Sequence, residues 1–226
     1  FEALVRWRHP TRGLVGPATF IPLMEEMGLI VPLGRFVLIE ACRHAAAWPG
    51  NLTLSVNLSP VQVKNQDLVT VVQGALRSSG LAAERLQLEV TESLFLDDAE
   101  GVLGTLQRLR ALGLVISMDD FGTGYSSLGY LSRFPFDKIK IDQSFVRDME
   151  KPESAAIVRA VIGLSSAMNM AVLAEGVETP EQYRRLRAEG CREMQGYLFS
   201  RPRPASDLAR MMVQINEQLA SSAFDI

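Results

Sequence analysis

Residues 114–128 read LVISMDDFGTGYSSL, an apolar strand-like run that ends in two adjacent aspartates and a loop with two glycines. Neighbouring carboxylates repel each other, and each is more stable in water or beside a cation. Two interpretations of Asp119 and Asp120 are therefore open. In the first, they form a solvated turn with an aspartate cap. In the second, they bind a divalent metal ion. The residues at the other expected strand ends decide between these interpretations.

Apolar strand-like runs alternate with helical patterns along the chain. Strands are expected at 1–7, 52–59, 85–93, 114–120, 138–142, 170–178 and 193–199, and helices at 18–27, 33–48, 65–78, 99–112, 153–168, 180–189 and 205–220. This alternation indicates an α/β protein with a parallel sheet covered by helices. A doubly wound open sheet and a (β/α) barrel with one strand missing both fit. No GxGxxG turn follows the first strand, which disfavours a nucleotide-binding open sheet.

The composition is that of a compact globular domain. The chain has 226 residues, 47% of them hydrophobic, and a net charge of −3. It has no long basic run, so no binding of long nucleic acid is expected. Cys42 and Cys191 are isolated, which suits a reducing compartment, and the most apolar run is too short to span a membrane. We expect a single domain over 1–226, located in the cytoplasm and incomplete at its N-terminus, since the chain begins at Phe1. Missing upstream segments would be able to anchor the full-length protein to a membrane.

Oxygen-bearing side chains recur where the expected strands end. They are Asn57, Glu89, Glu92, Asp119, Asp120, Asp142 and Glu175, and Glu2 lies in the first run. In a barrel these ends meet at the mouth where active sites are built. Oxygen ligands without cysteine or histidine favour Mg²⁺ or Mn²⁺. So many carboxylates fit two metal ions, roughly 3.5–4 Å apart, which would activate water for attack on a phosphodiester.

Each of these residues alone has an ordinary structural explanation. An Asp-Asp pair is a common cap, Asn57 suits a turn, and Glu89 suits a salt bridge at a sheet edge. Lys140 would be able to extend its amine from its strand to solvent. Their repetition at successive strand ends is hard to explain by caps, and it favours a metal site.

The same residues lie in segments that resemble a known family. FEALVRWRHP resembles the signature of the EAL-domain phosphodiesterases, which cleave the bacterial second messenger cyclic di-GMP. VNLSP, LEVTES, DDFGTGYSSL, DKIKID, AEGVET and QGYLFSRP are similar to further signatures of that family, in the same order. The resemblance covers nearly the whole chain, and it implies a modified TIM (β/α)8 barrel with an antiparallel early strand. The family's first strand lies before the EAL segment and is absent from this sequence.

The resemblance implies a role for each site residue. Glu2, Asn57, Glu89 and Asp119 would bind one Mg²⁺ or Mn²⁺ ion, and Asp119, Asp120 and Glu175 would bind the second. Lys140 would orient the attacking water with Asp142 close by, Glu175 is a candidate base, and Glu2 belongs with these catalytic residues. Arg6 and Gln195 would hold the substrate, and Glu92 would support the loop after Asp120. Gly122 and Gly124 would let that loop turn tightly.

The implied function is the hydrolysis of cyclic di-GMP to linear pGpG, by two-metal activation of water, in bacterial signalling. An EAL-type receptor that holds cyclic di-GMP without efficient cleavage is the alternative, and a barrel acting on another phosphodiester is a third. Because every expected ligand and Lys140 are present, catalysis is favoured. The family also suggests a homodimer and an upstream sensory or diguanylate cyclase-type domain in the full-length protein.

Overall fold

The computed structural model describes residues 1–65, 67–95, 98–123, 128–134 and 136–220. The chain forms two compact units, with residues 1–117 and 127–135 in unit 1 and residues 118–126 and 136–226 in unit 2. Gly124, expected to shape the loop after Asp120, lies outside the described residues. The expectation of a single domain over 1–226 stays a prediction.

Three strands in the described part of unit 1 pair in parallel. β1 (Glu2–Ala3) pairs with β4 (Leu54–Asn57), and β4 pairs with β5 (Leu86–Thr91). β1 is therefore not the antiparallel early strand that the family resemblance implies. Two helices lie between β1 and β4 in the chain, and a helical crossover returns the chain in its original direction.

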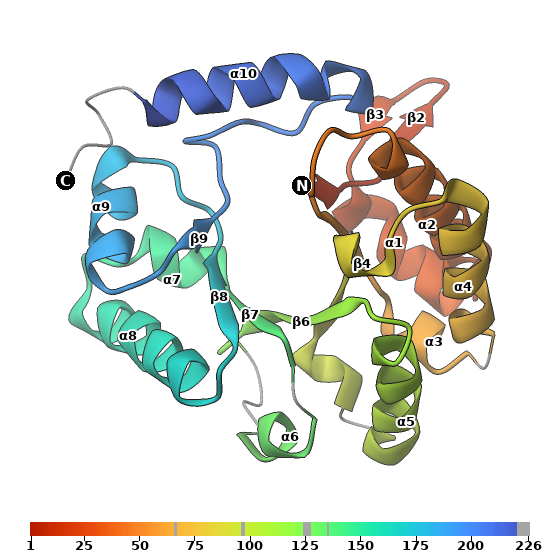
Figure 1. Ribbon diagram of the computed structural model, residues 1–226, viewed down its shortest axis with the longest axis horizontal. Helices are drawn as coiled ribbons and strands as arrows, with labels where there is room; N and C mark the ends of the chain where they lie inside the picture. Colours follow the sequence, from red (N-terminus) through yellow and green to blue (C-terminus); the bar gives the residue numbers. More distant parts are fainter. Residues whose placement is uncertain (66, 96–97, 124–127, 135, 221–226) are drawn as a thin grey trace. The chain divides into compact units, whose positions relative to one another are not determined.

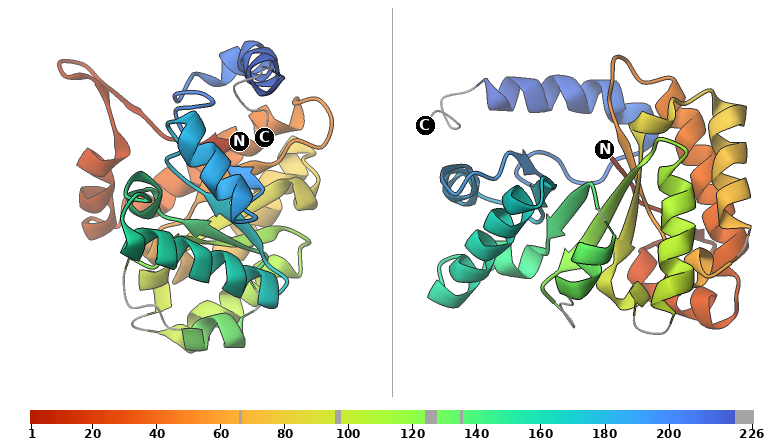
Figure 2. Two further views of the ribbon diagram at one scale, coloured as in Figure 1. Left: turned by 90° about the vertical axis from the view of Figure 1, so that its left-hand side faces the viewer. Right: turned by 60° about the horizontal axis from the view of Figure 1, so that its bottom comes forward.

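The first expected strand, 1–7, is shorter than its apolar pattern suggested. After β1 the chain enters a separate antiparallel hairpin of β2 (Trp7–His9) and β3 (Gly13–Val15). His9 Nδ1 accepts hydrogen bonds from the backbone N–H groups of Thr11 and Arg12, at 3.2 Å each, which shapes the turn. The hairpin projects away from the helix that follows it (Figure 2), and Trp7 stacks edge-on against Phe20 of that helix.

Helices cover the strands of unit 1. They are α1 (Pro17–Glu26), α2 (Ile30–Ala46), α3 (Pro60–Val63), α4 (Leu68–Ser79), α5 (Ala99–Arg110) and α6 (Leu128–Arg133), with short 3-10 turns η1 (Ala83–Arg85) and η2 (Glu92–Phe95). α2 packs side by side with α4 and against β4 (Figure 1). It buries Leu38, Cys42 and Ala45, which recur on one helical face and form part of the core.

Unit 2 repeats the same arrangement. β6 (Val115–Phe121) begins in unit 1 and ends in unit 2, and β7 (Lys138–Ile141), β8 (Ala171–Ala174) and β9 (Glu193–Met194) pair in parallel. The helices are α7 (Gln143–Arg147), α8 (Pro152–Ala167), α9 (Pro180–Ala188) and α10 (Leu208–Leu219), with η3 (Ala205–Asp207) before α10. α8 packs against β7 and β8 (Figure 1).

The predicted α/β class, with parallel strands separated by helices, is confirmed in both units. Strand ends of each unit carry the polar side chains that the sequence singled out. Among the residues that the structure describes, none of the helices combines the length and the apolar character needed to span a lipid bilayer.

Candidate functional site

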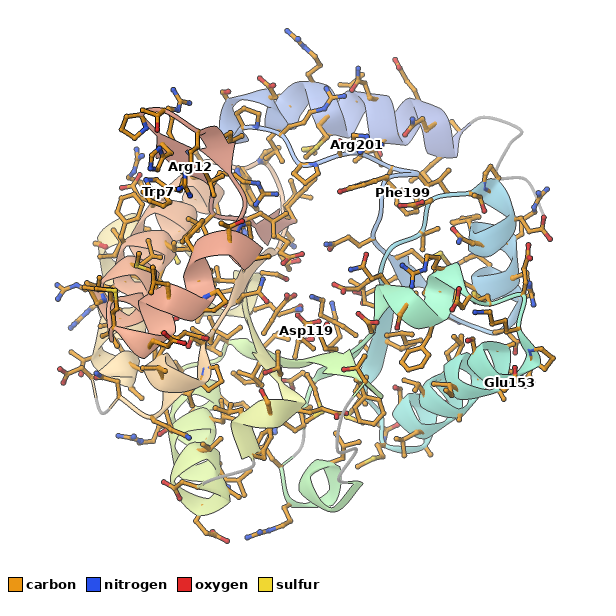
Figure 3. The ribbon with its side chains drawn as sticks, turned by 180° about the vertical axis from the view of Figure 1, so that it is seen from behind. Trp7, Arg12, Asp119, Glu153, Phe199 and Arg201 are labelled. Carbon is orange, nitrogen blue, oxygen red and sulfur yellow. The ribbon has the colours of Figure 1, made fainter. Side chains whose placement is uncertain are left out.

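The adjacent aspartates lie at the end of β6, where the backbone leaves the regular strand conformation (Asp119 is labelled in Figure 3). Asp120 has a φ of 54°, in the left-handed region. The carbonyl oxygen of Asp120 accepts a hydrogen bond from Thr123 Oγ1 at 2.8 Å, and Asp119 Oδ1 accepts one from the Asp120 N–H at 3.0 Å. In a regular strand the two side chains would point to opposite faces. The turn at Asp120 removes this restriction.

The two aspartates form a cluster with Glu175. One carboxylate oxygen from each of Asp119, Asp120 and Glu175 lies within 4.8 Å of the others. Glu175 directly follows β8, and its N–H donates a hydrogen bond of 3.1 Å to the carbonyl oxygen of Ile141 at the end of β7. The end of β6 and the residue directly after β8 thus bring three carboxylates together.

Lys140 of β7 lies among these carboxylates and is only 1% exposed. Its Nζ is 2.7 Å from Glu175 Oε1 and 3.0 Å from Asp119 Oδ1. One ammonium against three carboxylates leaves the cluster with an excess of negative charge. Burial makes such an excess costly unless a cation offsets it. Oxygen atoms are the ligands that Mg²⁺ and Mn²⁺ prefer, so the cluster fits the predicted metals.

A second set of predicted oxygen ligands lies in unit 1. Asn57 ends β4, and its Nδ2 donates a hydrogen bond of 2.6 Å to Glu2 Oε1. The parallel register sets Asn57 directly beside Glu89 of β5, whose side chain is 2% exposed. With its amide N–H₂ turned toward Glu2, the carbonyl oxygen of Asn57 is its remaining donor for a metal.

The loop after Asn57 is held by a cap. Ser59 Oγ accepts from the Val61 N–H at the start of α3 and donates to Glu25 Oε1 of α1 at 2.6 Å. Gln62 completes a capping box with Ser59, and its side chain lies against Gly34 of α2, where a Cβ would overlap with it. These contacts fix the chain directly after a predicted metal ligand.

The remaining predicted site residues have the following positions. Asp142 Oδ1 accepts from the backbone N–H (2.9 Å) and the hydroxyl of Ser144, so this carboxylate caps α7. Arg6 is exposed, and its Nη1 donates to the carbonyl oxygen of Val5 at 2.9 Å. Glu92 begins the short turn η2.

Gln195 lies directly after β9 and is joined to the chain around Glu175. Its N–H donates to the carbonyl oxygen of Ala174 at 2.8 Å, and its own carbonyl oxygen accepts from the Val177 N–H at 3.0 Å. These bonds continue the β8–β9 pairing past Glu175. Backbone hydrogen bonds thus join the segment of a predicted metal ligand to that of a predicted substrate-binding residue in unit 2.

Gln87, a polar neighbour of the predicted ligands, was missed at the sequence level. It is 3% exposed on β5 and donates a hydrogen bond of 3.2 Å from Nε2 to Glu89 Oε1. Alternation along a strand sets residues two apart on the same face, so a glutamine two positions before a predicted ligand was the available signal.

Comparison with known proteins identifies the family. The EAL domain family matches residues 1–202. The cyclic di-GMP phosphodiesterase PdeR of Escherichia coli is 44% identical over 208 residues, covering 90% of this chain and 32% of PdeR. The chain spans 26–32% of the length of the first curated relatives that it matches.

Two solved structures extend this similarity. The PaMucR phosphodiesterase, in complex with c-di-GMP, superimposes with a TM-score of 0.88 at 45% identity over 92% of this chain and 86% of that one. Klebsiella pneumoniae BlrP1, in a manganese/cy-diGMP complex, gives a TM-score of 0.78 at 35% identity over 89% of this chain and 51% of that one.

Proposed function

Because the chain belongs to the EAL domain family, whose relatives are named cyclic di-GMP phosphodiesterases and have the same fold, we propose that it hydrolyses cyclic di-GMP to linear pGpG. The observation that carries this proposal is the buried Lys140 between the carboxylates of Asp119 and Glu175, with Asp120 in the same cluster. Charged groups gathered in this way at strand ends are typical of a catalytic site.

The proposed cofactors are two Mg²⁺ or Mn²⁺ ions. The residues proposed as their ligands are Glu2, Asn57, Glu89, Asp119, Asp120 and Glu175. When bound, such ions offset the charge of a phosphodiester and lower the pKa of a water molecule. The manganese complex of BlrP1 and the all-oxygen donor set of the Asp119 cluster support this assignment.

A side chain beside Lys140 would accept the proton that the attacking water loses. Glu175 is proposed as the base, because the Lys140 Nζ lies 2.7 Å from its Oε1 and holds this carboxylate within the Asp119 cluster, where the attacking water would be bound. Lys140 itself also holds Asp119, so it fixes both carboxylates in position. Asp142 contributes by starting α7 at the end of β7.

Arg6 and Gln195 are proposed to hold the substrate. Arg6 is exposed, and a guanidinium binds phosphate oxygens with geometrically matched hydrogen bonds. Gln195 is half-buried on a backbone fixed by Ala174 and Val177. Glu92 is proposed to support the loop after Asp120.

A receptor that binds cyclic di-GMP without cleaving it is the second candidate. The specific observation against it is that Lys140 and the carboxylates of the Asp119 cluster are present and joined. A receptor has no need of such a cluster. Tight binding of cyclic di-GMP without any pGpG in Mg²⁺ or Mn²⁺ would establish the receptor.

Substitution of the two lysines of β7 tests the role of the cluster. Lys140→Met removes the ammonium that pairs with Asp119 and Glu175, whereas Lys138→Met removes a lysine that pairs with Glu193 at 2.5 Å. Turnover of cyclic di-GMP should fall at least 100-fold in Lys140→Met and less than threefold in Lys138→Met, because only Lys140 contacts the proposed base. Equal losses of turnover in both variants would contradict the proposal.

We further propose that the domain acts in the cytoplasm as a homodimer, within a longer protein that has a sensory or diguanylate cyclase-type domain upstream. Relatives such as the bifunctional diguanylate cyclase/cyclic di-GMP phosphodiesterase MucR, of which the chain spans 31%, support the longer architecture. The buried thiols Cys42 and Cys191 suit a reducing compartment.

A further inference from the structure

We propose that Gln87 is a positioning residue that orients the carboxylate of Glu89 for metal binding. The inference rests on the proposed function, in which Glu89 is a ligand, and it adds a residue that does not touch the metal itself. It is carried by the hydrogen bond from Gln87 Nε2 to Glu89 Oε1, at 3.2 Å, between two nearly inaccessible side chains.

The backbone of β5 sets these side chains on one face. Gln87 and Glu89 are two residues apart in a continuous strand, and their exposed fractions are 3% and 2%. β4 fixes the strand from one side, with Ser55 beside Gln87 and Asn57 beside Glu89, and the Leu58 N–H donates to the carbonyl oxygen of Glu89 at 2.9 Å. The backbone at Glu89 is thus held without the side chain of Gln87. The hydrogen bond from Gln87 therefore acts on the side chain of Glu89.

The chemistry of the pair requires the amide nitrogen to face the carboxylate. A carboxylate offers only acceptors, so the amide N–H₂ can donate to it while the amide oxygen would repel it. A donor on Oε1 limits rotation of the carboxylate and gives this buried oxygen a hydrogen-bond partner. Residues that do not bind the metal, but hydrogen-bond to one of its ligands, commonly increase metal affinity by orienting that ligand.

The neighbouring strands β1 and β4 also have a hydrogen bond from an amide to a carboxylate. Asn57 Nδ2 donates to Glu2 Oε1 at 2.6 Å, so a second carboxylate of unit 1 also receives an amide donor from its own sheet. Asn57 is expected from the sequence as a ligand, whereas Gln87 lies deeper in its strand, two residues before Glu89. Gln87 therefore serves orientation alone.

The test measures Mn²⁺ binding to the purified chain by calorimetry, without substrate. Gln87→Met keeps the length of the side chain and removes the donor, so Mn²⁺ should bind roughly 10–100-fold more weakly than to the parent. Thr105→Val is the control, because Thr105 is also buried in unit 1 but donates to the carbonyl oxygen of Gly101 in α5. Its affinity should stay within twofold of the parent. Gln87→Leu repeats the measurement if Gln87→Met does not fold.

A double-mutant cycle shows whether Gln87 acts through Glu89. In a Glu89→Gln background, Gln87→Met should change the affinity for Mn²⁺ by less than twofold, because the carboxylate that it orients is gone. Unchanged affinity in Gln87→Met alone, or an equal loss in both backgrounds, would overturn the positioning role and leave the proposed phosphodiesterase intact. A parent chain that binds no Mn²⁺ would overturn both proposals.

Discussion

Asp120 combines a predicted metal ligand with an unusual backbone. Its φ of 54° is rare for a residue with a side chain, although aspartate and asparagine adopt it more readily than others. The conformation brings the carboxylate into the Asp119 cluster, which a continued strand would prevent. Asp120 therefore loses backbone stability in a conformation that places its carboxylate in the cluster, and such strain is common at functional sites.

Paired substitutions measure the backbone part of this exchange. Asp120→Gly and Asp120→Ala both remove the carboxylate, but only alanine has a Cβ that opposes a positive φ. Asp120→Gly should be the more stable of the two by about 1 kcal/mol in denaturant unfolding with EDTA present. In an ordinary strand alanine would be the more stable variant, so that order would show that the turn is not required.

At the scale of single residues, the sequence predicts which residues belong to the site. It predicts less well the backbone and side-chain conformations in which they are held. Adjacent aspartates at the end of an apolar run point to a metal because their burial is otherwise costly. The positive φ of Asp120, the cap that Asp142 makes on α7 and the bond from Gln87 depend on rotamers and on local turns. Those features are decided by neighbours in space, which the residue pattern alone does not specify.

Among the elements, the segment after β9 departs most from its pattern. The apolar run 193–199 predicts a full strand, but only Glu193–Met194 pairs as one. Gly196 then packs so closely that a Cβ would overlap with the backbone of Val177, and the Leu198 N–H donates to the Val177 carbonyl oxygen at 2.9 Å. A close approach of two backbones thus replaces the strand, and glycine permits it.

Gly196→Ala should therefore destabilise unit 2. We expect a loss of roughly 1–3 kcal/mol, since the added methyl has to push Val177 and the Gln195 backbone apart. Gly163→Ala is the matched control, because Gly163 is exposed in α8 with open space where a Cβ would lie, and alanine is the better helix former. Thermal unfolding of both variants checks this. A Gly196→Ala variant as stable as Gly163→Ala would refute the close approach.

The strand order along the chain is predictable because apolar runs between helices require a parallel sheet. The ends of strands are less predictable. Run 1–7 reads as one strand, yet it divides into β1 and the first strand of a hairpin, whose second strand begins directly after the turn at Gly13, with a φ of 71°. Such turns override a continuous apolar pattern, because they change which backbone groups are able to pair.

Across the whole molecule, each unit contains one buried cysteine. Cys42 of α2 and Cys191, just before β9, both have 0% exposure, and burial raises the pKa of each thiol to about 11. Because a thiolate is the reactive form, both should resist a thiol reagent at pH 8 in the native protein and react rapidly in urea. The stability that the buried thiols contribute is complete below the unfolded value of 9.0 and is lost as the pH rises through about 11.

Mass spectrometry after a timed labelling pulse would measure the reactivity of each thiol separately. Rapid native labelling of Cys42 alone would show that unit 1 opens independently, and rapid labelling of Cys191 alone would show the same for unit 2. Rapid native labelling of both would contradict the burial on which this prediction depends.

The central claim concerns a reaction, and the separation of products after incubation with cyclic di-GMP tests it most directly. The purified chain should release linear pGpG in Mg²⁺ or Mn²⁺, and none in EDTA. Ca²⁺ should inhibit, because its larger and looser coordination misplaces the attacking water. The Lys140→Met variant should release almost no product under any of these conditions. Intact cyclic di-GMP after incubation with the folded parent chain in both activating metals would contradict the account.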